Sequence, residues 1–251
     1  EKQWKADVYM TEVINKFVRG RKSIAQVTQH SEVWSEEYNK QVRAMGENPL
    51  SDSSQFARNL RSAKHRLESI STPLGRSVLH LHALSMTSIA VAVKRKNGSE
   101  GKQAKEFLEW ITVESCVQLA MIADAGTEGF HFKGFGDSEK YDVARCASEI
   151  LHFVKVYHSM FVEGNVVKVG YTRHMLMLLR SPVMIPPWVV DGGKVLGFAD
   201  GIDVAIVQRC LSRMAGFVRM AIAEEANSPG CQEEDAPTCS LHRDGGRGFG
   251  V

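Results

Sequence analysis

Four clusters of lysine and arginine have the residue types and spacing to bind phosphate groups. The clusters are Arg19, Arg21 and Lys22; Arg58, Arg61, Lys64 and Arg66; Lys94, Arg95, Lys96, Lys102 and Lys105; and Arg209, Arg213 and Arg219. The net charge is only +2, so acidic residues nearly balance the basic ones over the whole chain. Clusters of cations in such a chain indicate that positive and negative side chains lie on different parts of the surface. A segregated basic face attracts phosphate, as lipid headgroups or as a nucleic-acid backbone. The alternative is an ordinary solvated face, the usual environment of charged side chains.

A metal site is the next chemistry to test, because histidine and cysteine occur together late in the sequence. Cys146, His152 and His158 fall within one expected helix, each six residues from the next. That spacing does not bring side chains together on neighbouring turns, as spacings of three or four would. Zinc needs four close nitrogen or sulfur ligands. We therefore predict no metal site.

Motifs of nucleophilic or hydrolytic catalysis are missing from the sequence. No GxSxG, HExxH or CxxC pattern occurs, and each of these motifs has a known mechanism. The glycines of residues 129–136 (GFHFKGFG) are followed by no GK[ST], so they do not predict a phosphate-cradling loop. Adjacent glutamates such as Glu36 and Glu37 do not converge on a helix. We predict that the protein is not an enzyme and needs no cofactor.

The composition is that of a soluble helical protein. Of 251 residues, 43% are hydrophobic and 24% are charged, ordinary values for a globular chain. Five cysteines without paired spacing do not predict a disulfide framework and favour a reducing compartment. The first residues lack the apolar segment of a signal peptide. Scarce proline before Pro182 and apolar residues at helical spacing favour an all-α fold.

One apolar helix, residues 72–96, is the expected centre of the fold. Thr72 is a suitable N-cap and Pro73 suits the first helical position, while Asn97 and Gly98 are a stop signal. No residue from 77 to 93 carries a formal charge, which indicates either a buried helix or a membrane span. The segment is short for a bilayer and contains polar side chains, so we favour burial in the core.

The other expected helices divide the chain into two helical subdomains of a multi-helix bundle. They cover residues 5–18, 31–45, 52–69, 102–124, 138–161, 172–180 and 200–226, with a short helical segment at 23–29 and a loop at 126–136. We expect no strand pair. The proline-rich connector 181–193 is the best internal boundary. It separates an N-terminal domain, residues 1–180, from a C-terminal helical portion, residues 194–226, and a flexible tail, residues 227–251, whose composition does not support a core.

Residues 71–79 (STPLGRSVL) resemble a segment of influenza-type matrix proteins that reads small-Pro-Leu-x-basic-small-aliphatic-Leu and opens an apolar helix. In that family a basic run follows the helix, and Lys94, Arg95 and Lys96 occupy the comparable place. The resemblance points to the orthomyxovirus matrix proteins, in a divergent branch such as the thogotoviruses. The family's suggested Cys/His zinc pattern is not reproduced by Cys146, His152 and His158.

The resemblance implies a helical virion protein that polymerises beneath the viral envelope. Its implied partners are anionic membrane lipids, the viral ribonucleoprotein or RNA, and further copies of itself in a homo-oligomer or lattice. Its implied locations are the inner face of the envelope, as a peripheral membrane protein, and the cytoplasm and nucleus of the host cell. Lys94, Arg95 and Lys96 match the family's basic site, and Arg76 matches the basic position of the motif.

A viral nucleoprotein that encapsidates RNA is the alternative function, because it would use the same cations in a groove between helical lobes. Both functions give one set of candidate lipid- or RNA-binding residues: Lys94, Arg95, Lys96, Lys102, Lys105, Arg58, Arg61, Lys64, Arg66 and Arg76.

Overall fold

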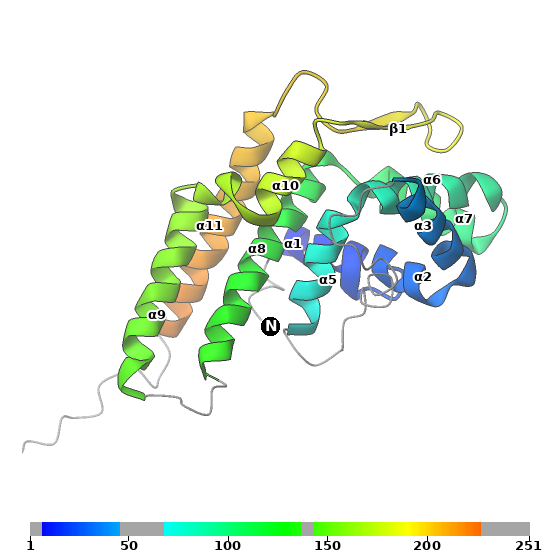
Figure 1. Cartoon of the computed structure of the whole chain (residues 1–251). Helices are drawn as coiled ribbons and strands as arrows, with labels where there is room; N and C mark the ends of the chain where they lie inside the picture. The colour runs from blue at the N-terminus through cyan, green and yellow to red at the C-terminus, as the bar shows by residue number, and fades with distance from the viewer. Residues whose placement is uncertain (1–6, 46–67, 137–142, 227–251) are drawn as a thin grey trace, which may run out of the picture.

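The computed structural model describes residues 7–45, 68–136 and 143–226, and these residues are mostly helical (Figure 1). The all-α class predicted from the sequence is therefore confirmed. The expected helix 52–69 lies outside the described residues except for its last two positions, and so does the tail from residue 227 onward.

Helices make up most of the described elements, with one short strand pair. In chain order they are α1 (Val8–Ile14), a π-helical turn (Asn15–Arg19), α2 (Ile24–His30), α3 (Glu32–Ala44), α5 (Glu68–Leu79), α6 (Leu81–Lys94), α7 (Ser99–Trp110), α8 (Val113–Gly136), α9 (Val143–Tyr157), a π-helical turn (His158–Val162), a 3-10 turn (Asn165–Lys168), α10 (Gly170–Leu178), β1 (Val183–Ile185), β2 (Lys194–Leu196) and α11 (Val204–Ala226).

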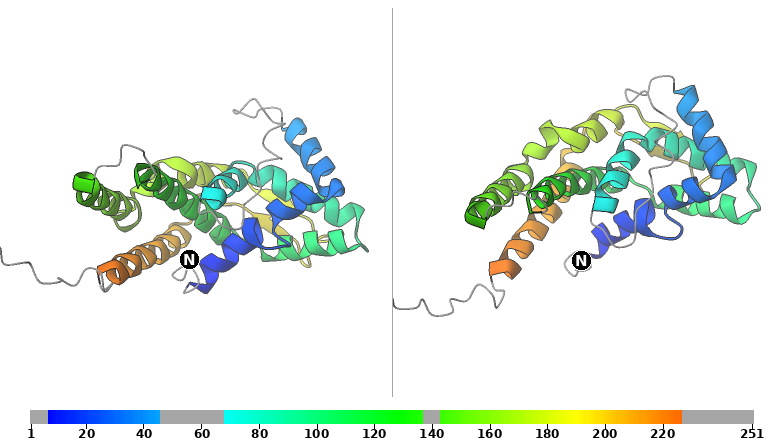
Figure 2. Two further views of the ribbon diagram at one scale, coloured as in Figure 1. Left: turned by 90° about the horizontal axis from the view of Figure 1, so that it is seen from below. Right: turned by 60° about the horizontal axis from the view of Figure 1, so that its bottom comes forward.

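Helix α8 is the central element and packs against α5, α10 and α11. Its first half is largely apolar and buried, as expected of a helix surrounded by others. The helices α2, α3, α6 and α7 form one end of the molecule, and α9, α11 and the second half of α8 extend to the other (Figures 1 and 2). One cluster of buried hydrophobic residues runs from α1 to α11.

The expected helix 72–96 is two helices, so the prediction of one continuous helix is wrong. Helix α5 begins at Glu68 and contains Pro73, and the chain bends by 75° at His80 before α6 begins. The bend lets α5 pack on α8 while α6 packs between α3 and α7. Both halves are largely buried. Among the described residues, no single helix is long and apolar enough to cross a membrane, and only the bent α5–α6 pair passes that test.

The expected limits of helix 102–124 are also wrong, and the expected loop 126–136 is helical. Helix α7 ends at Trp110, and α8 begins at Val113 after two intervening residues, because Thr112 and Ser115 cap each other: each hydroxyl accepts the other residue's backbone N–H. Helix α8 then continues through Gly126 to Gly136. A Cβ at position 126 would lie 3.0 Å from the Ser71 side chain, so this glycine serves close packing against α5.

The proline-rich connector forms a β-hairpin, which corrects the expectation of no strand pair. β1 and β2 are antiparallel, with Val183 opposite Leu196 and Ile185 opposite Lys194. Helix α11, after the hairpin, packs along α8 in the hydrophobic cluster described above. The division into two subdomains at this connector stays a prediction.

Candidate phosphate-binding surface at the α6–α7 turn

The turn between α6 and α7 holds Arg95 and Lys96 in a fixed, exposed position. The Gly98 N–H donates to the Arg95 carbonyl, and α7 begins at the next residue. A Cβ on Gly101 would lie only 2.0 Å from the Arg95 carbonyl oxygen, so glycine permits the first turn of α7 to pack against the end of α6. The chain therefore reverses sharply, and Arg95, Lys96 and Lys102 are all exposed around the reversal.

Lys94 and Lys105, two of the predicted site residues, form ion pairs with carboxylates of the protein. Lys94 donates to the buried carboxylate of Glu37, and this hydrogen bond holds the pKa of Glu37 below its ordinary value. Lys94 therefore attaches the end of α6 to α3. Lys105 lies 3.3 Å from the Asp191 carboxylate and 3.5 Å from that of Glu109. The hydrogen bond to Asp191 raises the pKa of Lys105.

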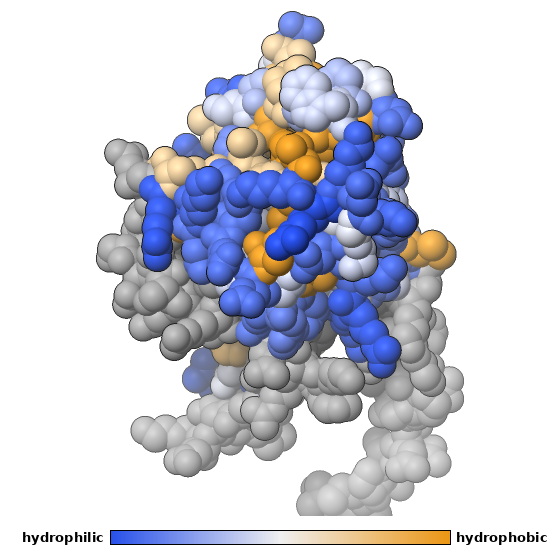
Figure 3. All heavy atoms as spheres, turned by 90° about the vertical axis from the view of Figure 1, so that its right-hand side faces the viewer, coloured by the Kyte–Doolittle hydropathy of each residue, from blue (hydrophilic) through white to orange (hydrophobic). Residues whose placement is uncertain are grey.

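Arg95, Lys96 and Lys102 form no ion pair within the part of the chain that the structure describes. We call these three residues the basic turn. Figure 3 looks directly onto this end of the molecule, and hydrophilic residues cover most of it. The basic turn has the charge and exposure needed to contact an external anion.

A second basic segment lies beside the basic turn. The Gln103 amide on α7 donates to the Lys22 carbonyl over 3.1 Å, which places the exposed side chains of Arg21 and Lys22 next to α7. Between them is an open hollow of about 560 Å³, whose charged lining residues are Glu12, Lys16, Arg21, Lys22 and Glu106. The structure thus brings together two segments that are distant in sequence, although carboxylates dilute the positive charge of the hollow.

Arg76, the remaining described candidate, lies in a different environment. It is half-buried on α5, close to the phenol groups of Tyr38 and Tyr171, and burial lowers its pKa. Helix α6 separates it from the basic turn, a distance of about 20 Å at 1.5 Å per residue. Arg76 is therefore not part of the exposed surface. The predicted residues Arg58, Arg61, Lys64 and Arg66 lie outside the described residues.

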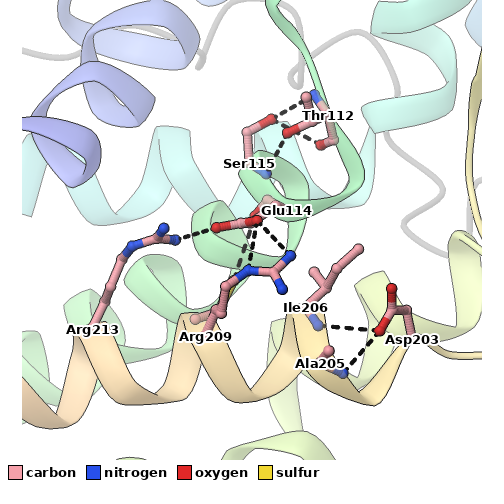
Figure 4. A network of polar contacts seen from close by, with 9 residues as sticks. Thr112, Glu114, Ser115, Asp203, Ala205, Ile206, Arg209 and Arg213 are labelled. Atoms are coloured by element: carbon pink, nitrogen blue, oxygen red, sulfur yellow. Dashed lines mark hydrogen bonds and ion pairs between the residues drawn. The ribbon is translucent and has the colours of Figure 1, made fainter.

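Two arginines of α11, Arg209 and Arg213, are paired with one carboxylate of the protein, a feature that sequence reasoning missed. Arg209 donates to one oxygen of Glu114 over 2.9 and 3.1 Å, and Arg213 donates to the other over 2.5 Å (Figure 4). Arg213 also lies 4.2 Å from the centre of the Tyr9 ring. Burial alone would raise the pKa of Glu114, but the two guanidinium groups outweigh it and lower the pKa. We call these three charged residues the Glu114 cluster; they join α8 to α11.

The histidines and cysteines tested for metal binding lie along α9 and its π-helical extension. Cys146 is half-buried, and His152 and His158 are exposed. Among the residues described, no group of three or more His, Cys, Asp and Glu side chains is arranged to hold a metal ion.

Comparisons with known protein families, with curated protein sequences and with solved structures found no match to this chain.

Proposed function

We propose that this chain is a structural protein of the orthomyxovirus matrix type, which coats the inner face of an envelope by binding anionic lipid. The observation that carries the proposal is the basic turn: three exposed cations that form no ion pair with any described residue, on a tightly packed reversal between two helices. An ordered backbone at the turn favours binding, because less backbone freedom is lost on contact.

The strength of such a contact is modest for a single copy. Each lysine or arginine near an anionic surface contributes about 1 kcal/mol, so the basic turn supplies about 3 kcal/mol. Polymerisation would raise the affinity of the coat, since linked copies bind the same surface together. Self-association into a lattice is therefore part of the proposal.

The resemblance supports the same function and adds partners to it. The matching segment 71–79 lies in α5, and the apolar α6 that follows it ends at Lys94, with Arg95 and Lys96 directly after it. In a matrix protein these residues would also contact the viral ribonucleoprotein. The protein would then be found in the virion and in the cytoplasm and nucleus of the host cell.

Vesicle flotation tests the proposal directly. The full chain is mixed with vesicles of phosphatidylcholine alone or with added phosphatidylserine, at low and at high salt. We expect flotation only with phosphatidylserine, and less of it at high salt, because exposed charges are screened within about 8 Å at physiological ionic strength. Flotation that ignores both lipid charge and salt would rule the proposal out.

RNA encapsidation is the second candidate, favoured by the hollow that Lys16, Arg21 and Lys22 line beside the basic turn. The carboxylates of Glu12 and Glu106 in the same lining weaken the attraction for a polyanion. An RNA affinity that falls steeply with salt, together with indifference to lipid charge, would favour this candidate over the matrix function.

A further inference from the structure

The β1–β2 hairpin carries an apolar face that points away from the protein. Val183, Ile185 and Leu196 are buried, and the alternation of side chains along each strand directs their neighbours outward. Met184 and Val195, which are opposite each other across the strand pair, are 65% and 44% exposed. At the end of the hairpin, Trp188 is 73% exposed.

The hairpin packs against α6 through β1 and is hydrogen-bonded to the end of α7, so its outer face has a defined position. Val189 and Val190 follow Trp188 and are buried, and both of their N–H groups donate to the Pro186 carbonyl. The Lys194 ammonium donates to the carbonyls of Leu108 and Glu109, at the end of α7. An apolar face held in this way is not a loose loop that could fold back onto the core.

The basic turn and the hairpin lie at the same end of the molecule. In Figure 1 the free end of the hairpin projects in the same direction as the α6–α7 turn, and in Figure 3 the hairpin lies above the hydrophilic surface. The Lys105–Asp191 ion pair links the two, because Lys105 is on α7 three residues after Lys102. One flat surface could therefore touch both.

We propose that Trp188, with Met184 and Val195, inserts into the headgroup layer of the anionic membrane that the basic turn binds. This inference rests on the proposed function and names how its surface engages lipid. Tryptophan favours the membrane interface, where the ring leaves water while the indole N–H keeps a polar partner. The adjacent cations select an anionic bilayer as the occupant, since an apolar protein surface would leave them without counter-charges.

Tryptophan fluorescence with nitroxide-labelled lipids tests the insertion. Wild-type protein bound to phosphatidylserine vesicles should show a blue-shifted emission that nitroxides near the headgroups quench. The assay uses a Trp4→Phe background, which leaves three tryptophans. In it, Trp188→Phe keeps an aromatic ring and should still float, but it should lose the quenched component, because Trp34 is buried and Trp110 is half-buried. Trp188→Ser should lower vesicle partitioning about tenfold, the effect of returning a few tens of Å² of apolar surface to water.

The outcomes separate this inference from the proposed function. If wild type floats with anionic vesicles but its emission is neither shifted nor quenched, the hairpin does not insert, and the electrostatic function stands. If wild type does not float at all, the proposed function fails and the insertion fails with it. A blue shift that grows with protein concentration without vesicles, and is absent in Trp188→Phe, would assign the hairpin to contacts between copies and overturn the insertion.

Discussion

The basic turn and the Glu114 cluster differ in whether the protein pairs their cations with carboxylates. Arg209 and Arg213, one helical turn apart on α11, both donate to one carboxylate and hold α11 on α8. Arg95, Lys96 and Lys102 surround a tight reversal and have no carboxylate partner among the described residues. A run of cations is therefore available for external binding only where the fold supplies no carboxylate to neutralise it.

The backbone also differs between the two regions, and glycine substitutions should reveal this most strongly. Gly101→Ala would place a Cβ 2.0 Å from the Arg95 carbonyl oxygen, and neither backbone segment can move freely. We expect a loss of about 3 kcal/mol of stability, or about 8 °C in the melting temperature, together with loss of vesicle binding.

Gly216→Ala on α11 is the matched control for that substitution. Nothing lies within 4 Å of the Cβ it would add, so removing a helical glycine should stabilise the protein by up to about 1 kcal/mol. Equal melting temperatures for the two variants would show that the α6–α7 reversal is not tightly packed.

Removing the shared carboxylate of the Glu114 cluster should have the next largest effect. Glu114→Ala leaves two arginines side by side without a counter-ion, and we expect a loss of about 2 kcal/mol, less than for a fully buried pair because Arg209 is half exposed. Urea unfolding measures it. Glu36→Ala, at an exposed position on α3, should change stability by less than about 0.5 kcal/mol. Vesicle binding should persist in folded Glu114→Ala, since the basic turn is intact.

A structural feature could be predicted from the sequence only where it depends on residues close together in the chain. The helical class was predictable because apolar spacing is a local signal. The ends of α5 and α7 were not, because the bend at His80 and the start of α8 at Val113 satisfy packing against distant helices. The hairpin was missed because three-residue strands are too short to show alternation.

The candidate site was predictable to a similar extent. The charges of Arg95, Lys96 and Lys102 and their position after an apolar helix could be read from the sequence. The pairing of Lys94 with Glu37 joins residues 57 apart, and that of Arg213 with Glu114 joins residues 99 apart. No spacing rule reaches such separations, so only the fold distinguishes paired cations from exposed ones.

Acid should lower the stability contributed by the Lys94–Glu37 pair and by the Glu114 cluster, with a smaller effect than the substitutions above. The pKa of Glu37 and that of Glu114 are both lower in the folded protein. Their contribution to stability is therefore present above the unfolded pKa of about 4.3 and is lost as the pH falls through the folded values. We expect each to contribute on the order of 1 kcal/mol, since both pairs are partly exposed. Thermal melts from pH 6 to pH 3 should fall less steeply for Glu37→Gln and Glu114→Gln than for wild type; parallel curves would contradict the ion pairing.

The proposed lipid binding depends on where cations lie and not on how many there are. The direct test compares the vesicle partitioning of two triple variants. The first is Arg95→Ala/Lys96→Ala/Lys102→Ala, which removes the basic turn. The second is Lys155→Ala/Lys168→Ala/Arg219→Ala, which removes three exposed cations from α9, the 3-10 turn and α11. We predict that the first variant loses about 100-fold in affinity for phosphatidylserine vesicles and the second less than about threefold. Equal losses in the two variants would contradict the account.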